Sequence, residues 1–142
     1  MEQQFPKELH ALDAIFGFLD RFYSEHRIDR APAYALSLAV EEFFTNIVKY
    51  GGSKKGEVTI SAAYEPGRVT VLIVDPDGVR FDPTQAQVPQ DDVPLDRRPV
   101  GGLGIHITRQ MLDTVRYEYR DRKGTLTLVK NLEPQHVQNN TK

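Results

Sequence analysis

Residues 57–75 carry the feature that most restricts the fold of this chain. Two runs rich in β-branched residues, EVTISAAYE and RVTVLIVD, are joined by Glu65-Pro66-Gly67-Arg68. A Pro-Gly pair is typical of a tight turn, so the two runs are predicted to pair as an antiparallel hairpin. We therefore expect an antiparallel sheet in the fold.

Helical periodicity is found on both sides of this hairpin. From about Pro6 to His26, apolar residues recur at spacings of three and four, which predicts a helix with one apolar face. A second such run follows Arg30-Ala31-Pro32 and ends at Gly51-Gly52, a pair suited to a helix C-cap. A third helix is expected after the glycines near residue 101, with the apolar set Ile105, Ile107, Met111, Leu112 and Val115.

Two more strand-like runs, VRYEYR and GTLTLVKNL, close the body of the chain. The polar, proline-rich residues 83–99 are predicted to be a mobile loop. We expect an α+β fold, a two-layer sandwich with helices packed on one face of a mixed, mostly antiparallel sheet. Residues 1–132 are expected to form a single domain, followed by a polar C-terminal tail at 133–142.

The charge and composition of the chain exclude several functional classes. Lys and Arg total 18 against 20 Asp and Glu, so the chain lacks the basic field that draws nucleic acid or an anionic membrane. Without cysteine there is neither a disulfide framework nor thiolate chemistry. The N-terminus has no signal-peptide pattern, and no stretch approaches the roughly 20 apolar residues of a membrane span. We expect a cytoplasmic protein with no direct nucleic-acid or membrane contact.

The segment VGGLGIHITRQMLD, residues 100–113, places three glycines directly before an expected helix. A helix N-terminus offers unpaired N–H groups and a partial positive charge, and glycines let the backbone approach an anion closely. The segment suits phosphate binding, although an ordinary glycine-rich turn explains the loop alone equally well. It is not a Walker motif, because no Gly-Lys-Ser/Thr follows, and no βαβ unit surrounds it as a dinucleotide site requires.

Two polar motifs accompany the glycines. In EEFFTNIVKY, Glu42 and Asn46 lie one helical turn apart on the same face, as reactive groups or as part of a solvated face. A carboxylate there can deprotonate a hydroxyl, and an amide oxygen suits Mg²⁺. In VDPDGVRFDP, a carboxylate before a glycine at a strand end can accept a hydrogen bond from an exocyclic amine, although a Pro-Asp-Gly turn is the simpler explanation.

The order of these motifs is more specific than any one of them. Glu-x-x-x-Asn on a helix, an Asp-x-Gly-like motif after a strand, a polar loop and Gly-x-Gly at a helix start resemble the Bergerat ATP-binding fold of the GHKL superfamily, shared by gyrase, histidine kinases and MutL. Over about residues 5–132 the chain resembles the small anti-sigma-factor serine/threonine kinases. The resemblance rests on the segments FPKEL, VEEFFTNIVKYGG, DGVRFDP, GGLGIHITRQMLDTVRYEYR and GTLTLVKNL.

The resemblance implies roles for individual residues. Glu42 is expected to be the general base for a hydroxyl of the protein substrate, and Asn46 to be a ligand of the Mg²⁺ that bridges the phosphates of ATP. Gly78 is expected beneath the adenine, with Thr125 as a further adenine contact. The backbone that wraps the phosphates is expected at Gly101, Gly102, Leu103, Gly104 and Ile105. Arg97 and Arg98 reach a phosphate or remain solvated charges.

The chain departs from the family pattern at the adenine motif. Family members usually carry an acid two residues before the glycine, and here that position is Pro76, between Asp75 and Asp77. Either Asp75 or Asp77 reaches the adenine amine, and Asp75 is favoured because it ends the strand VTVLIVD. If neither does, nucleotide affinity or base selectivity is reduced.

The implied activity is that of an anti-sigma factor and serine-protein kinase. Such a protein binds Mg-ATP, phosphorylates a serine or threonine of a STAS-type anti-anti-sigma partner, and alternately sequesters a sigma factor; its relatives suggest a homodimer. The alternative is an ATP-binding docking module without efficient phosphotransfer. The presence of both Glu42 and Asn46 favours the kinase, and Pro76 favours the docking module.

Overall fold

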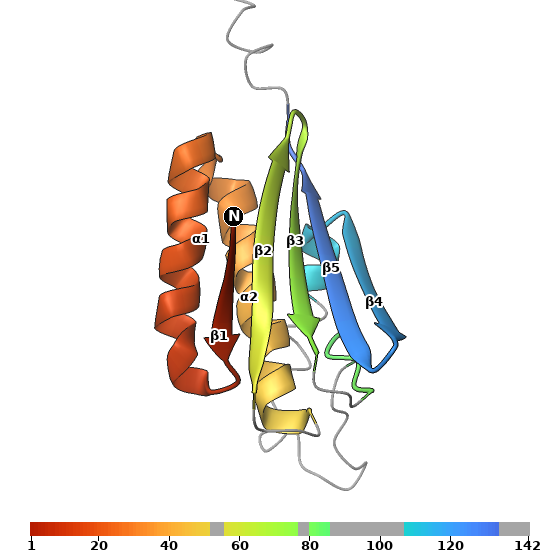
Figure 1. The fold of residues 1–142 in the computed structure, drawn as a ribbon. Helices are drawn as coiled ribbons and strands as arrows, with labels where there is room; N and C mark the ends of the chain where they lie inside the picture. The colour runs from red at the N-terminus through yellow and green to blue at the C-terminus, as the bar shows by residue number, and fades with distance from the viewer. Residues whose placement is uncertain (52–55, 77–79, 86–106, 134–142) are drawn as a thin grey trace, which may run out of the picture.

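The computed structural model describes residues 1–51, 56–76, 80–85 and 107–133. Its strands form one sheet in the order β1-β2-β3-β5-β4, and each neighbouring pair is antiparallel (Figure 1). Helices α1 and α2 lie against one face of this sheet. The bounds are β1 Glu2–Pro6, α1 Leu12–His26, α2 Arg30–Tyr50, β2 Glu57–Glu65, β3 Arg68–Asp75, β4 Thr114–Arg120 and β5 Lys123–Asn131.

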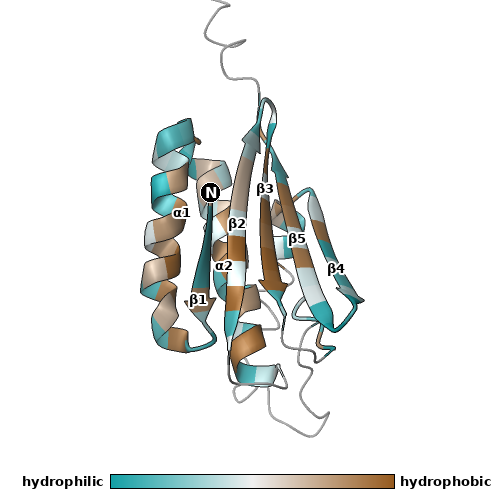
Figure 2. Ribbon diagram, in the orientation of Figure 1, coloured by the Kyte–Doolittle hydropathy of each residue, from teal (hydrophilic) through white to brown (hydrophobic). Residues whose placement is uncertain are grey.

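This architecture confirms the expected two-layer α+β fold. The β2–β3 hairpin has the bounds that the sequence predicts, and Gly67 in its turn has a φ of 95°, a conformation that favours glycine. The sheet was expected to be mixed, but the described strands contain no parallel pair. Figure 2 shows the hydrophobic residues of the sheet concentrated along its central strands, each of which pairs with a strand on both sides.

The first helix begins later than the sequence predicted. Residues Glu2–Pro6 pair with β2 as an edge strand, and a single 3-10 turn, Leu9–Ala11, leads into α1. The predicted helix start at Pro6 is therefore wrong, because these residues gain a partner in β2 that lies more than 50 positions away. The second helix includes Pro32 in its first turn, where a missing N–H leaves no helical bond unmade.

The second helix ends at Gly51, as the sequence predicted. A Cβ at this position would lie 2.5 Å from the carbonyl oxygen of Ile47, so a side chain would collide with the backbone of the last turn. The Gly51 N–H donates to that same carbonyl at 3.0 Å. Glycine is thus needed here for space, since its φ of −65° suits any residue.

The core lies between the helices and the sheet. Its largest fully buried side chains come from β1, α1, α2 and the three central strands: Phe5, Phe18, Phe22, Phe43, Phe44, Ile15, Leu19, Leu36, Ile60, Ile73, Leu126 and Leu128. Of the expected third helix, residues 107–111 are described and helical, whereas Leu112 follows the helix and Val115 belongs to β4, so the predicted helix extends too far. Thr108 and Leu112 are buried. In the described part of the chain, no helix has the length and hydropathy of a membrane span.

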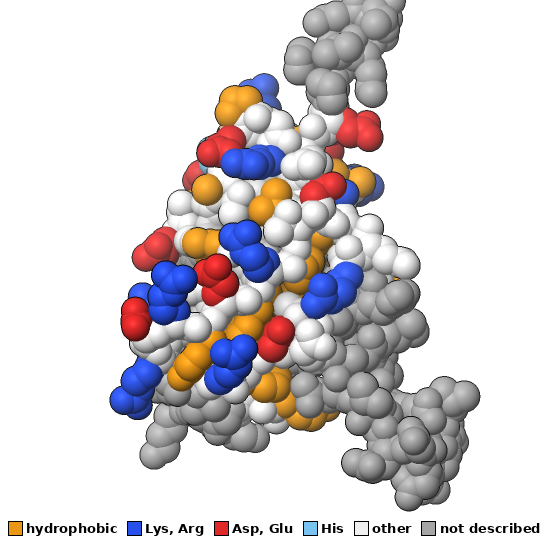
Figure 3. Space-filling model, turned by 90° about the vertical axis from the view of Figure 1, so that its right-hand side faces the viewer, with side chains coloured by type: hydrophobic (Ala, Val, Ile, Leu, Met, Phe, Trp, Pro, Cys, Tyr) orange, Lys and Arg blue, Asp and Glu red, His pale blue; other side chains and the backbone are white. Residues whose placement is uncertain are grey.

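The side of the molecule formed by β4 is amphipathic. Figure 3 shows hydrophobic side chains in a diagonal strip, with Lys or Arg and Asp or Glu side chains along its borders. In β4 itself, exposed charged residues alternate with half-buried aromatic ones, as in Arg116, Tyr117, Glu118 and Tyr119. An edge strand that carries charges in this way resists uncontrolled pairing with other chains.

Candidate functional site

Glu42 and Asn46 lie one turn apart in the second half of α2. Glu42 is half-buried, and burial raises the pKa of its carboxyl above the ordinary value; the negative charge of Glu41 raises it further and Lys49 lowers it. Such a carboxylate accepts a proton more readily than an exposed one, which suits a general base. Asn46 is 4% exposed, so its amide is enclosed by the protein.

The amide of Asn46 is fixed by the segment that follows β3. Its Nδ2 donates to the carbonyl oxygen of Pro83 at 3.0 Å. The neighbouring Asp82 closes a local turn, because its Oδ1 accepts from the N–H and the Oγ1 of Thr84 at 2.9 and 2.6 Å. On the other side, the Phe81 N–H donates to the Tyr117 hydroxyl of β4 at 3.2 Å. Residues 80–85 therefore connect α2 with β4.

Asp75 lies at the end of β3 on the face covered by the helices. Alternate residues of this strand, Val69, Val71 and Ile73, are buried there, and Asp75 continues the series. Asp75 also lines a cavity of about 10 Å³, together with Ile47, Ile73, Phe81, Pro83, Tyr117, Gly124 and Leu126. Because Ile47 directly follows Asn46, the fold brings Asp75 and the Glu42–Asn46 face to the same end of the molecule. A cavity of this volume admits about one water molecule.

The structure does not bring the Thr125 side chain to this cavity. On β5 the residues of the helix-covered face are Gly124, Leu126 and Leu128, so strand alternation places Thr125 on the other face. The β5 residue opposite Asp75 is Gly124. A Cβ at Gly124 would lie 2.8 Å from the Tyr117 hydroxyl, so glycine makes room for Tyr117 beside the cavity.

One charged residue of this region is absent from the expectations drawn from the sequence. Lys7, just after β1, is 3% exposed, and its Nζ lies 3.0 Å from Oδ1 and 3.2 Å from Oδ2 of Asp75. Lys7 lies within the helix that the sequence predicts from about Pro6, and that helix implies no contact with Asp75. Had Glu2–Pro6 been interpreted as a strand, its alternation would have put Phe5 and Lys7 on one face.

Several predicted site residues lie outside the described residues. They are Asp77 and Gly78 of the adenine motif, Arg97 and Arg98 of the polar loop, and the phosphate-binding residues Gly101, Gly102, Leu103, Gly104 and Ile105. The described groups with a predicted role that meet at one end of the fold are therefore Glu42, Asn46 and Asp75.

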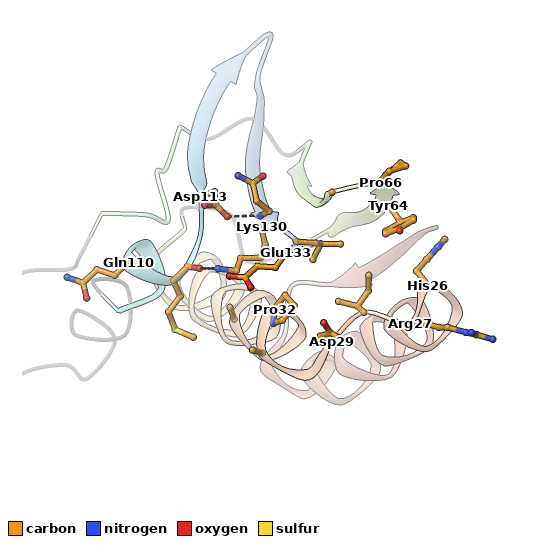
Figure 4. A pocket seen from close by; sticks show the side chains of 17 residues that line it. His26, Arg27, Asp29, Pro32, Tyr64, Pro66, Gln110, Asp113, Lys130 and Glu133 are labelled. Atoms are coloured by element: carbon orange, nitrogen blue, oxygen red, sulfur yellow. Dashed lines mark hydrogen bonds between the residues drawn. The ribbon is translucent and has the colours of Figure 1, made fainter. Parts of the chain in front are cut away.

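A larger cavity lies at the opposite end of the sheet. Its volume is about 1130 Å³, and it lies between the start of α2, the β2–β3 turn and the end of β5 (Figure 4). Here Lys130 donates to the carbonyl oxygen of Met111 at 2.8 Å, and Asp113 accepts from the Asn131 N–H at 2.6 Å. None of Glu42, Asn46 and Asp75 lines this cavity, so its size does not make it the candidate site.

The described residues hold no group of three His, Cys, Asp or Glu side chains suited to a metal ion. The candidate ligand among them is the Asn46 amide, a hard oxygen donor. Mg²⁺ is commonly held by one or two protein oxygens, with phosphate and water at the other positions. The donor set therefore fits a magnesium ion that arrives with a nucleotide.

Comparisons with known proteins found both a matching family model and a relative of similar length. A family model described as "Histidine kinase-like ATPase domain" matches residues 5–130. The chain is 28% identical over 127 residues to the serine/threonine-protein kinase BtrW of Bordetella bronchiseptica, and the match covers 88% of each chain.

Two solved structures are similar in fold. One contains the RsbU and RsbW domains of Rv1364c from Mycobacterium tuberculosis, with a TM-score of 0.66 and 16% identity; the match covers 92% of this chain and 31% of that one. The other is the SiaB-SiaC complex from Pseudomonas aeruginosa, with a TM-score of 0.55 and 15% identity, covering 93% of this chain and 89% of the matched chain.

Proposed function

Because this chain belongs to the histidine kinase-like ATPase domain family, we propose that it binds Mg-ATP and phosphorylates a protein hydroxyl. The observation that carries the proposal is the pair on α2: a half-buried carboxylate with a raised pKa, Glu42, one turn from a buried amide, Asn46. Phosphoryl transfer depends on positioned groups and on neutralised phosphate charge, and one helix here holds both a candidate base and a candidate metal ligand.

In the proposed reaction, Glu42 takes the proton of a serine or threonine hydroxyl as that oxygen attacks the γ-phosphorus of ATP. The new P–O bond forms as the bond to the leaving ADP oxygen breaks. The Asn46 oxygen would hold Mg²⁺, which neutralises phosphate charge when it is bound. Asp75 would accept a hydrogen bond from the adenine amine, and the glycines at 101–104 would enclose the phosphates.

The proposal about partners is based on the names of the similar proteins. One relative is named a serine/threonine-protein kinase, and the structural neighbours include an RsbW domain and a SiaB-SiaC complex. We propose a STAS-type anti-anti-sigma protein as the phosphate acceptor and a sigma factor as the sequestered partner of a homodimeric, cytoplasmic protein, which would place the chain in transcription regulation.

A phosphotransfer assay with labelled Mg-ATP and candidate anti-anti-sigma proteins from the same genome tests this proposal. Glu42→Gln keeps the side-chain shape and removes the base, so transfer should fall about 100-fold or more while ATP affinity changes only a few-fold. Asn46→Ala should reduce both transfer and Mg-ATP affinity. Glu41→Gln is the matched control at a pH above the raised pKa of Glu42, where that carboxyl is deprotonated in both proteins, since residue 41 points about 100° away around the helix.

A second candidate function, an ATP-binding docking module, is favoured by one observation. The acid expected two residues before Gly78 is replaced by Pro76. If the wild-type protein binds Mg-ATP and a cognate partner but never transfers phosphate, the docking module is the better account. Equal transfer by wild type and Glu42→Gln would instead show that Glu42 is not the base.

A further inference from the structure

The ion pair between Lys7 and Asp75 lies at the edge of the proposed nucleotide site. The Lys7 side chain is 1% exposed and the Asp75 side chain 26%, and the ammonium nitrogen is within 3.2 Å of both carboxylate oxygens. Lys7 follows the first strand and Asp75 ends the third, so the lysine reaches across the helix-covered face of the sheet. The pair joins segments 68 residues apart in the sequence.

Stability alone gives no reason for this pair. Removing two charges from water is costly, and a buried ion pair contributes little more than well-packed apolar side chains of the same volume. The Lys7 backbone is fixed separately, because its N–H donates to the carbonyl oxygen of Gly56 at 3.2 Å. Neither packing nor the backbone contact therefore explains why a lysine and an aspartate occupy these two positions.

The position of the carboxylate suggests that role. Asp75 lines the small cavity whose other walls are largely apolar, including Ile47, Ile73 and Leu126. A carboxylate that loses a hydrogen-bonded cation is less firmly held in place. With the Lys7 ammonium within 3.2 Å of both its oxygens, the Asp75 carboxylate keeps one orientation beside the cavity.

We propose that Lys7 is a positioning residue that gives the nucleotide site its preference for adenine. A fixed carboxylate accepts a hydrogen bond from the amine at position 6 of adenine, whereas the oxygen at position 6 of hypoxanthine meets it lone pair to lone pair. This inference rests on the proposed function, because it assumes that the base of a bound nucleotide lies beside Asp75. Lys7 acts on the base through Asp75 and takes no part in phosphate transfer.

The test compares the Kd values of Mg-ATP and Mg-ITP, which differ in the group at position 6 and share the sugar and phosphates. For wild type the Kd of Mg-ITP should exceed that of Mg-ATP about tenfold or more, as expected for a hydrogen bond to a charged group. Lys7→Met keeps the apolar stem and removes the ammonium, so this ratio should fall toward one. If Lys7 had only a structural role, Lys7→Met would raise the Kd of both nucleotides equally and leave the ratio unchanged.

Two further variants give the controls. Lys7→Arg retains a cation for Asp75 and should keep most of the wild-type ratio. Arg68→Gln removes an exposed cation that pairs with Glu65 in the β2–β3 turn, at the far end of β3, and should leave the ratio unchanged. If Lys7→Met does not fold, the double variant Lys7→Met with Asp75→Asn removes both charges of the pair; its ratio should lie near one, because an amide pairs with either base.

The outcomes separate this inference from the proposed function. Wild-type binding of Mg-ATP and Mg-ITP with equal Kd would overturn the role of Lys7 and leave nucleotide binding in place. A preference for ATP that survives in Lys7→Met, or in the double variant, would also overturn it. If wild type binds neither nucleotide, the proposed function itself fails, and the assignment of Lys7 fails with it.

Discussion

At the scale of single residues, Glu42 should leave a signature in the pH dependence of catalysis. Its pKa is raised first by burial and then by Glu41. A general base acts only when deprotonated, so kcat/KM for phosphotransfer should rise with pH and level off above this raised pKa. Glu41→Gln removes one cause of the shift, so the rising limb should move to lower pH. A pH series of kcat/KM checks this; an unmoved limb in Glu41→Gln would assign it to another group.

Tyr23 makes a prediction for stability at high pH. Burial raises its pKa to about 12, and its hydroxyl lies 2.9 Å from Oγ of Ser37. The unfolded chain loses this proton near pH 10, whereas the folded chain retains it. The stabilisation is therefore complete below about pH 10 and is lost as the pH rises through about 12, at up to about 1.4 kcal/mol per pH unit.

Urea denaturation over this pH range, with Tyr23→Phe as the comparison, measures that effect. The variant has no phenol to titrate, so its free energy of unfolding should fall less steeply with pH than that of wild type. Below about pH 10 it should be less stable than wild type by about 1 kcal/mol, because it loses the hydrogen bond to Ser37. Parallel alkaline slopes for the two proteins would show that Tyr23 does not titrate in this way.

How well each site residue could be predicted depends on how far apart in the sequence it and its partner lie. Glu42 and Asn46 were found because they share one helix, whose geometry fixes their relation. The Lys7–Asp75 pair was not found, because it depends on how β1 and β3 are arranged in the sheet. Thr125 was placed in the site by a motif, and strand alternation turns its side chain to the other face.

At the scale of elements, the same rule separates the two kinds of strand. The β2–β3 hairpin was predicted with its bounds because alternation and a Pro-Gly turn are local signals. Strand β1 was missed because Phe5 is its only buried residue and its sequence does not alternate apolar with polar residues. Only its pairing with β2 defines it as a strand. An edge strand of this kind can be recognised only from its pairing, whereas a central hairpin carries its signals in its own sequence.

Two glycines should respond oppositely to alanine. At Gly124 an added Cβ lies 2.8 Å from the Tyr117 hydroxyl, which must move and release the Phe81 N–H. Gly124→Ala should therefore destabilise the fold by about 1 kcal/mol or more. At Gly17 in α1 the nearest atom is at 3.9 Å, on Arg21, so Gly17→Ala should stabilise by about 0.5–1 kcal/mol. Urea denaturation measures both; a neutral Gly124→Ala would contradict the close contact with Tyr117.

At the scale of the whole molecule, the cavity that the described residues form beside Asp75 is small. Phe81 and Pro83 line a cavity of about 10 Å³ beside Asp75, too small for a purine. Nucleotide binding should therefore displace residues 80–85 from β4 and break the bond from Phe81 to Tyr117. Hydrogen exchange measures this: the Phe81 amide should lose protection on addition of Mg-ATP. Increased protection would show that the base binds elsewhere.

Mg-ATP should also stabilise the folded chain as a whole. A ligand that binds only the folded state adds about 2.7 kcal/mol at a concentration one hundred times its Kd, which raises the Tm. If Asn46 holds Mg²⁺, removing the metal with a chelator should lower the Tm gained with ATP in wild type but have little effect in Asn46→Ala. Glu42→Gln should keep the full Mg²⁺-dependent rise, because its carboxylate is assigned to the protein hydroxyl alone. Differential scanning fluorimetry of the three proteins, with and without chelator, makes the comparison; an equal chelator effect in wild type and Asn46→Ala would remove Asn46 from the metal site while leaving ATP binding intact.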